Sequence, residues 1–140
     1  NLGQLGRERH GAHDVVLVGF GGYRGGVVAG EYWGAPMQRM PVREAWPGSL
    51  ERLLHDRVGR DALFVFDTPE RRAPWLVETL PHRAIGVVYD PNHERYGNYV
   101  PTVLAERYDA FLYFDDTGPV RPLHLEPQTG GEAQTYPAGV

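Results

Sequence analysis

The stretch that most constrains the fold runs from Asp14 to Gly26 and reads DVVLVGFGGYRGG. Its apolar run, residues 15–18, is typical of a strand that is covered on both faces of a sheet. Glycine occupies five of the next eight positions. Because glycine permits positive φ angles and close backbone approach, we expect the strand to end there in a sharp turn. Ligands collect at the carboxyl ends of strands in open α/β sheets, so Tyr23 and Arg24 in this turn are candidate ligand contacts. The alternative is a turn that has a structural role only and contacts no ligand.

Short apolar segments that alternate with short helices make up the rest of the chain. Ser49 is well placed as an N-cap, and the leucines after it predict an amphipathic helix that ends at Gly59. Pro36 and Pro41 indicate that at least one strand near them lies at a sheet edge or is irregular. The predicted strands cover residues 14–20, 27–29, 37–42, 61–67, 83–89 and 109–114. Two further helices are predicted, over residues 2–9 and 74–80. The first of these should pack against the sheet.

Residues 92–101 are predicted to form a loop, and residues 100–108 at most two helical turns. Helices that alternate with buried strands are the mark of βαβ units. The sequence therefore predicts an α/β fold with a mostly parallel central sheet flanked by helices, as part of a larger domain.

Length and composition limit the class of protein. A chain of 140 residues is one domain's worth, and its formal charge of −4 is spread without the basic patch that draws proteins to nucleic acid or anionic membranes. The absence of cysteine excludes disulfides, thiolate metal sites and cysteine nucleophiles, and it fits a reducing compartment, so a cytoplasmic location is expected. The sequence shows neither a secretory signal nor an apolar run of about 20 residues that could span a membrane.

The two ends of the sequence carry expectations of their own. The first residue is Asn1 and not methionine, which suggests that the chain does not begin where its gene does. Residues 126–140 are rich in Pro, Gly, Gln and Thr and are expected to form a disordered tail after a folded part of residues 1–125.

Familiar catalytic motifs are absent from the sequence. A dinucleotide fingerprint that starts at Gly19 and Gly21 has Arg24 where its third glycine belongs. The lone serine, Ser49, lies in a proline–glycine loop and not in a nucleophile elbow, which excludes serine hydrolysis within this chain. Neither class of enzyme is supported.

The histidines and aspartates offer weak candidates. His10 and His13 are three residues apart but lack a third ligand at a fixed spacing, so we expect them to be solvated and to hold no metal. The remaining histidines are predicted to be surface or cap residues and not general bases: His55, His82, His93 and His124. Carboxylates could gather at one edge of the sheet after the strands, although turn and cap roles are commoner for such residues: Asp67, Asp115 and Asp116.

Six segments in order resemble the carboxyl-terminal part of the erythromycin esterase family. They span nearly the whole chain except the tail and read NLGQLGRERHG (1–11), VVLVGFGGYRGGVVAGEYWGAPMQRM (15–40), WPGSLERLLH (46–55), HRAIGVVYDP (82–91), GNYVP (97–101) and RYDAFLYFDDTGPVRPLH (107–124). The resemblance implies an α/β fold with helices around a central sheet. It also implies hydrolysis of macrolide lactones or related esters by activated water, a reaction linked to antibiotic resistance.

The resemblance also implies what this chain lacks. In the family, a histidine general base near the amino end activates water with help from acidic and arginine residues, and none of these positions matches a residue here. We therefore expect no hydrolysis by this chain alone, no catalytic residue within it, and no metal or organic cofactor. Its expected role is a wall of the substrate cleft, with Phe20, Tyr23 and Arg24 as substrate contacts. Its expected partners are a small-molecule ester and the missing amino-terminal half of its own domain.

Two other hypotheses remain open at this point. The chain could be a non-catalytic module that binds a small anionic ligand through the glycine turn from Gly19 to Gly26, with Tyr23 and Arg24 as the contacts. It could also be a domain fused to a phosphoribosyltransferase or a methyltransferase, because esterase-like domains of this family can occur in such fusions.

Overall fold

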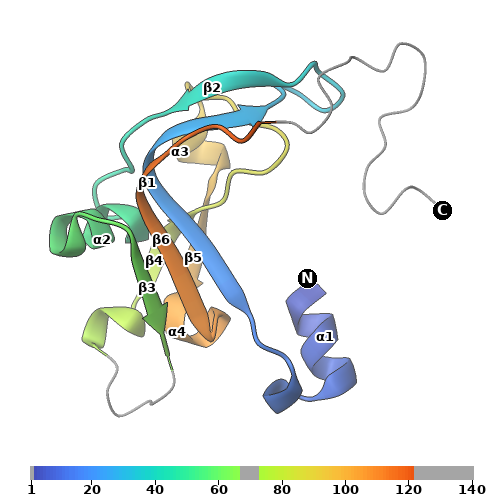
Figure 1. Ribbon diagram of the computed structural model, residues 1–140, viewed down its shortest axis with the longest axis vertical. Helices are drawn as coiled ribbons and strands as arrows, with labels where there is room; N and C mark the ends of the chain where they lie inside the picture. The colour runs from blue at the N-terminus through green and yellow to red at the C-terminus, as the bar shows by residue number, and fades with distance from the viewer. Residues whose placement is uncertain (1, 67–72, 122–140) are drawn as a thin grey trace.

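The computed structural model describes residues 2–66 and 73–121, and every structural statement below concerns these residues. A bent central sheet lies in front of a second, smaller sheet in the view of Figure 1, with short helices around both. The elements in chain order are α1 (Leu2–His10), the 3₁₀ turn η1 (Ala12–Asp14), β1 (Val18–Ala29), β2 (Gln38–Val42), α2 (Leu50–Val58), β3 (Ala62–Val65), the 3₁₀ turn η3 (Pro74–Leu76), β4 (Thr79–Arg83), α3 (Glu94–Gly97), β5 (Tyr99–Val103), α4 (Leu104–Arg107) and β6 (Ala110–Thr117).

The central sheet is mixed, with the strand order β2-β1-β6-β3. β1 and β6 run parallel, whereas β2 pairs with β1 and β3 pairs with β6 in antiparallel fashion. The α/β class is confirmed, but the prediction of a mostly parallel sheet is wrong for the strands that the structure describes. For one of the two antiparallel pairs the reason is local: β1 and β2 are consecutive strands joined by a short connection, and such strands run antiparallel.

β1 passes through the glycine-rich stretch without turning back. The predicted strand over residues 14–20, the predicted turn and the predicted strand over residues 27–29 are together one strand of 12 residues, which begins only at Val18. Pairing overrides the low strand propensity of glycine, because β6 pairs with β1 from Val18 to Gly25 and β2 pairs with it from Gly25 onward. The prediction of a sharp turn is therefore wrong.

The glycines of β1 allow close packing and one bend. A Cβ atom at Gly19 would lie 2.7 Å from the rings of Phe111 and Tyr108, and one at Gly21 would lie 2.5 Å from the ring of Phe111. Gly25 has a φ of 137°, a conformation that side-chain-bearing residues rarely adopt. Figure 1 shows that β1 curves strongly between its two ends, so that its second half and β2 lean away from its first half.

The helix α2 forms as its sequence predicts. The Ser49 side chain accepts a hydrogen bond from the backbone N–H of Arg52 at 3.3 Å, and Gly59 ends the helix in the left-handed conformation. Leu50 and Leu54 are fully buried in the core beneath the sheet, where they join Phe111.

The segment between residues 74 and 108 departs most from the prediction. The predicted helix over residues 74–80 is a single 3₁₀ turn, and β4 ends at Arg83, where the predicted strand over residues 83–89 was to begin. Beyond Arg83, Val88 makes an isolated parallel bridge with Gly30. The predicted loop contains α3 and most of β5, and the predicted helical turns reduce to α4.

The remaining predictions concern β2, β3, the first helix and the C-terminal tail. β2 falls within its predicted range and, as Pro41 indicated, lies at an edge of the described sheet. β3 also lies within its predicted range but is not buried on both faces, because Leu63 and Val65 are each 61% exposed. α1 buries none of its side chains, and an ion pair of 2.7 Å between Arg7 and Asp109 ties it to the rest of the chain. The predicted tail lies outside the described residues.

Candidate functional site

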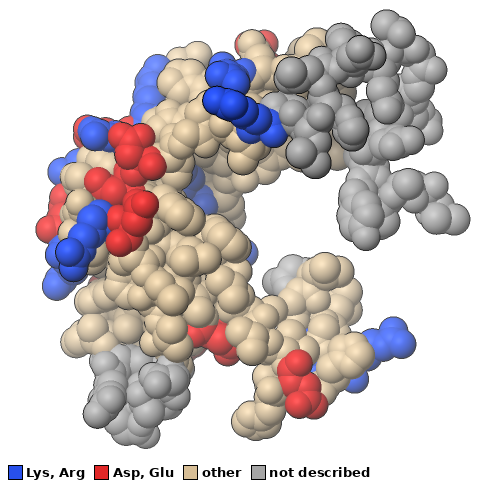
Figure 2. Space-filling view, in the orientation of Figure 1, with Lys and Arg blue, Asp and Glu red and all other residues tan. Residues whose placement is uncertain are grey.

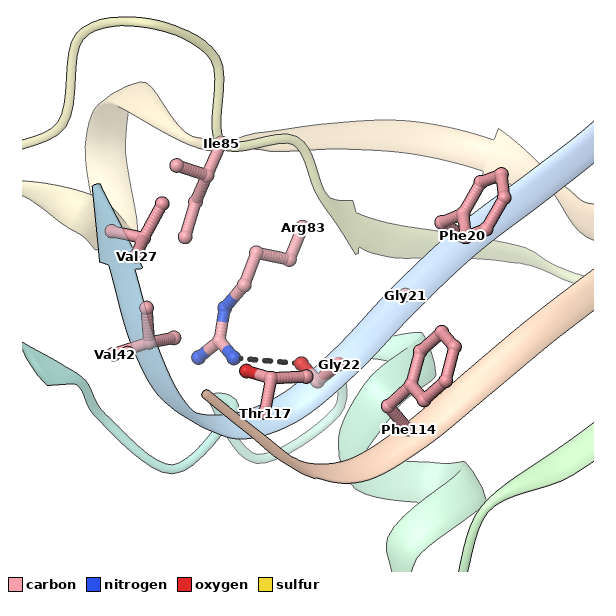
Figure 3. A pocket seen from close by; sticks show the side chains of 10 residues that line it. Phe20, Gly21, Gly22, Val27, Val42, Arg83, Ile85, Phe114 and Thr117 are labelled. Carbon is pink, nitrogen blue, oxygen red and sulfur yellow. Dashed lines mark hydrogen bonds between the residues drawn. The ribbon is translucent and has the colours of Figure 1, made fainter. Parts of the chain in front are cut away.

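A pocket of about 330 Å³ lies on the inner side of the bend in β1 (Figure 3). Sites that bind small molecules have volumes of roughly 300–1,000 Å³, so this one suits a small molecule or one part of a larger ligand. β1, β2 and β6 supply most of its wall, and β4 contributes its last residue. The lining residues are Phe20, Gly21, Gly22, Gly26, Val27, Val42, Arg83, Ile85, Phe114 and Thr117.

Arg83 holds the bend in its shape. Figure 3 shows its side chain reaching from β4 to the curve of β1. Its Nη1 donates to the carbonyl oxygens of Gly22 at 2.9 Å and Tyr23 at 2.7 Å, and its Nη2 donates to the carbonyl of Arg43 at 2.9 Å. Its Nε lies 2.5 Å from Oε1 of Glu94, so the buried positive charge is balanced. Arg83 thus joins β1 to the segment that follows β2.

Glu94 connects Arg83 to Tyr89, which packs against the far end of β1 and β2. Its Oε2 accepts a hydrogen bond of 2.7 Å from the hydroxyl of Tyr89, which is itself almost fully buried. Burial raises the pKa of Tyr89, and the hydrogen bond to the Glu94 carboxylate raises it further. Tyr89 therefore remains a neutral donor near neutral pH.

A second buried polar pair lies beneath β1. Oε1 of Glu51, which is fully buried, lies 2.5 Å from Nδ1 of His82 and accepts the backbone N–H of Arg83 at 3.1 Å. The same oxygen would lie 3.4 Å from a Cβ at Gly21, one of the pocket residues. Glu51 therefore links α2 to β4 and fixes the strand end from which Arg83 extends.

The predicted substrate contacts do not gather in one place. Phe20 lines the pocket and is 61% exposed. Tyr23 points to the opposite face of the sheet, where it is buried and its ring stacks on His55 with centroids 3.8 Å apart. The alternation of side chains along a strand separates the two residues. Burial raises the pKa of the Tyr23 hydroxyl.

Arg24 lies among carboxylates at the surface. Its Nε donates to Oδ2 of Asp116 at 3.1 Å, and its Nη1 lies 3.7 Å from Oε1 of Glu44. The Arg24 guanidinium is therefore already paired with carboxylates. In the hypothesis of an anionic ligand, the same charge was expected to bind the ligand. The role of all three predicted residues in binding substrate stays a prediction.

The structure corrects the placement of His82. The sequence predicts a surface or cap residue, but His82 is 4% exposed and its ring packs edge-on against Phe111. Sequence reasoning missed it because Glu51, its partner, is 31 residues away and on another element. Arg83 was also missed, although a charged residue at the head of the apolar run AIGVVY was a usable signal.

The other weak candidates have ordinary partners. His55 is partly exposed and its Nδ1 lies 2.7 Å from Oδ1 of Asp115, which also accepts the hydroxyl of Tyr113 at 2.7 Å. His93 lies at the surface as predicted, with its Nδ1 2.6 Å from Oδ2 of Asp90. Asp67 and His124 lie outside the described residues.

Among the described residues there is neither a cluster of metal ligands nor a helix that could span a membrane. In residues 2–66 and 73–121, no three His, Cys, Asp or Glu side chains come together in a way that could hold a metal ion, and His10 and His13 are both exposed. Over the same ranges, the helices are too short and too polar to cross a membrane.

Two solved structures share this fold. The crystal structure of a succinoglycan biosynthesis protein aligns with a TM-score of 0.63 and 16% sequence identity, over 83% of this chain and 27% of that one. A crystal structure of a protein from Bacillus cereus aligns with a TM-score of 0.60 and 14% identity, over 79% of this chain and 28% of that one. The chain therefore spans little more than a quarter of the length of these two structures.

The family match covers most of the chain. Residues 1–117 match the erythromycin esterase family, and this range contains every strand that the structure describes, the pocket in the bend of β1, and both buried polar pairs. The chain belongs to the erythromycin esterase family.

Proposed function

We propose that the protein to which this chain belongs is a carboxylic-ester hydrolase, and that the chain forms one wall of its substrate site. Membership of the erythromycin esterase family over residues 1–117 is the observation that carries the proposal. The proposed substrates are macrolide lactones or related esters, and a role in antibiotic resistance would follow from the first of these.

The proposed reaction needs only water and a base. The water oxygen attacks the ester carbonyl carbon while a general base accepts its proton. The tetrahedral intermediate then collapses, the bond to the alcohol oxygen breaks, and that oxygen takes up a proton, which leaves a carboxylate and an alcohol. A positioned base accelerates such a step by about a hundred- to ten-thousand-fold. We assign this base to polypeptide other than these 140 residues.

The pocket in the bend of β1 supports a binding role for this chain. Its walls are largely apolar, and Phe20 stands at its rim with most of its ring exposed. Arg83 is already engaged by three backbone carbonyls and Glu94, so it shapes the pocket and is not the group that recognises an anion. The apolar part of an ester is the chemistry that suits such a wall.

The alternative of a non-catalytic module for anions has less support. It relies on a glycine turn, whereas residues 19–26 form part of a strand, and on Arg24, whose charge faces Asp116 and Glu44.

The test uses the complete natural gene product. It is incubated with a macrolide lactone and with a panel of simple esters, and mass spectrometry follows the gain of one water. We expect cleavage of at least one ester and, for Phe20→Ala, a severalfold higher KM with a smaller change in kcat. We expect no change for Tyr96→Ala, which alters an even more exposed ring that does not line the pocket. Absence of cleavage across the panel, or unchanged kinetics for Phe20→Ala, would contradict the proposal.

A separate experiment tests whether the general base lies outside these 140 residues. The purified 140 residues are expected to cleave none of these esters. Saturable cleavage by this chain that is lost on His10→Ala or His13→Ala would place the base here and overturn its assignment elsewhere.

A further inference from the structure

The pocket in the bend of β1 has two ends of different character. Figure 3 shows Val27, Val42 and Ile85 together at one end, and Phe20 with Phe114 at the other. Val42 is only 9% exposed, whereas Phe20 is 61% exposed. We call the three branched side chains the aliphatic end. The pocket is therefore deep at its aliphatic end and open at its aromatic rim.

The aliphatic end has a firm backing. Val42 itself belongs to a small buried cluster, and the other two branched side chains pack against that cluster. The members of the cluster are Ala29, Met40, Val42 and Tyr89. Because protein interiors are close-packed, side chains in such a cluster cannot move aside without cost. A ligand group too large for this end therefore meets a wall that resists it.

The side chains that line the pocket offer little to a polar ligand. Among the described residues that line it, Arg83 is the only charged one, and its guanidinium is engaged by three backbone carbonyls and by Glu94. The hydroxyl of Thr117 donates to the carbonyl oxygen of Arg24 at 3.1 Å. Figure 2 shows charged side chains gathered on the outer side of the bend, around α2, whereas the inner side is mostly uncharged. A polar group that entered would lose its hydration without gaining a partner.

We propose that this pocket selects its ligand by the size of one uncharged, saturated hydrocarbon group, and that Val42 sets the size limit. A cavity of about 150 Å³ with apolar walls holds one benzene ring, so a pocket of about 330 Å³ has room for roughly two such rings, the rim included. The aliphatic end alone should accept a group of roughly four to six carbon atoms. In a hydrophobic pocket, one methylene too many or too few changes kcat/KM by roughly 10- to 200-fold.

The reacting carbonyl of an ester lies outside the aliphatic end under this proposal. Stabilising the negative charge that develops on its oxygen requires donors aimed at that atom, and the side-chain donors of the pocket are already engaged. The hydrocarbon group belongs to either the acyl or the alcohol part of the ester. The kinetic form of this inference rests on the proposed ester hydrolysis, whereas binding of the hydrocarbon group does not.

Kinetics of the complete natural gene product test the size limit. One series of p-nitrophenyl esters varies the acyl chain from acetate to decanoate, and one series of acetates varies the alcohol from ethanol to decanol. We expect kcat/KM to peak at one chain length in one series, which identifies the part of the ester that enters. Val42→Ala should move the peak to a longer chain and Val42→Phe to a shorter one. Val103→Ala, on β5 and outside the pocket lining, should leave it in place.

Binding without hydrolysis separates this inference from the proposed function. Dissociation constants of straight-chain alcohols from butanol to octanol are measured by ligand-observed NMR, with the same variants of the complete protein. Each methylene that enters should lower the Kd about fourfold until the limit is reached. Hexanoate should bind at least about tenfold more weakly than hexanol, because its carboxylate finds no partner in the pocket. Val27→Leu is a second filling variant, and circular dichroism checks that each variant is folded.

The outcomes of the two experiments are distinct. A size limit for the alcohols without cleavage of any ester would contradict the proposed function and support this inference. Ester cleavage with a chain-length profile that no folded variant of Val42 or Val27 shifts would overturn this inference and leave the proposed function intact. Hexanoate that binds as tightly as hexanol would also overturn it.

Discussion

Single residues with distant partners determine how the interior of this protein is built. Glu51 on α2 joins His82 and the backbone of Arg83 on β4, and the sequence gives no sign of this contact, because neither spacing nor hydrophobic pattern relates residues on different elements. The same limit explains why His82 was predicted at the surface. In contrast, the Ser49 cap was predictable, because a cap forms between residues three apart in the chain.

Removal of the Glu51 carboxylate is expected to destabilise the whole chain. Glu51→Ala leaves the buried His82 ring and the Arg83 backbone N–H without their acceptor, and breaking a buried pair in this way costs roughly 3–5 kcal/mol. Glu51→Gln retains a carbonyl oxygen as acceptor, so its loss should be smaller. Urea unfolding followed by circular dichroism measures both, with Glu31→Ala at an exposed position as the matched control. Equal and small effects for all three variants would show that the pair contributes little to stability.

At the scale of elements, β1 is the strand that organises the fold and the one that the sequence pattern describes least well. In a sequence alone, glycine usually indicates a turn. In β1 the glycines have another role: because they lack side chains, the rings of Phe111 and Tyr108 can pack against the strand. Whether a glycine run turns or continues depends on partner strands that lie far away in the chain. The helix α2 and the strands β2 and β6 could be located because their signals are local.

The bend in β1 is expected to depend on Gly25. Gly25→Ala forces a side chain into a φ of 137° and directs its Cβ at the carbonyl oxygen of Thr117, so we expect a loss of at least roughly 1–3 kcal/mol in the free energy of unfolding. Gly97→Ala is the control, because a Cβ there meets nothing within 4 Å. Chemical denaturation of the two variants tests this, and a Gly25→Ala protein as stable as the control would mean that the bend is not held in this conformation.

At the scale of the molecule, acid should weaken the contact between α2 and β6. Burial alone would raise the pKa of Asp115, but hydrogen bonds from His55 and Tyr113 outweigh it and hold the pKa below its ordinary value. The unfolded pKa is about 3.9, so the stabilisation is fully present above that pH and is lost as the pH falls toward the lower folded value.

The corresponding experiment compares wild type with Asp115→Asn across pH. We expect the variant to be less stable near neutral pH and the difference in unfolding free energy to shrink as the pH falls from about 5 to about 2. Glu31→Gln, which changes an exposed carboxylate, should show no such trend. A difference between wild type and Asp115→Asn that stays constant with pH would mean that the Asp115 carboxylate has the same pKa in both states.

The parallel pairing of β1 with β6 also affects how the protein is made. Val18 pairs with Ala110, 92 positions later in the chain, so the ribosome completes β1 long before its neighbour exists. Until then the emerging polypeptide can form the β1–β2 hairpin but not the pair on which the rest of the sheet is assembled. Val18 and Phe20 therefore spend the interval of synthesis without a neighbouring strand, so this apolar stretch of the nascent chain is exposed to non-native contacts until β6 is made.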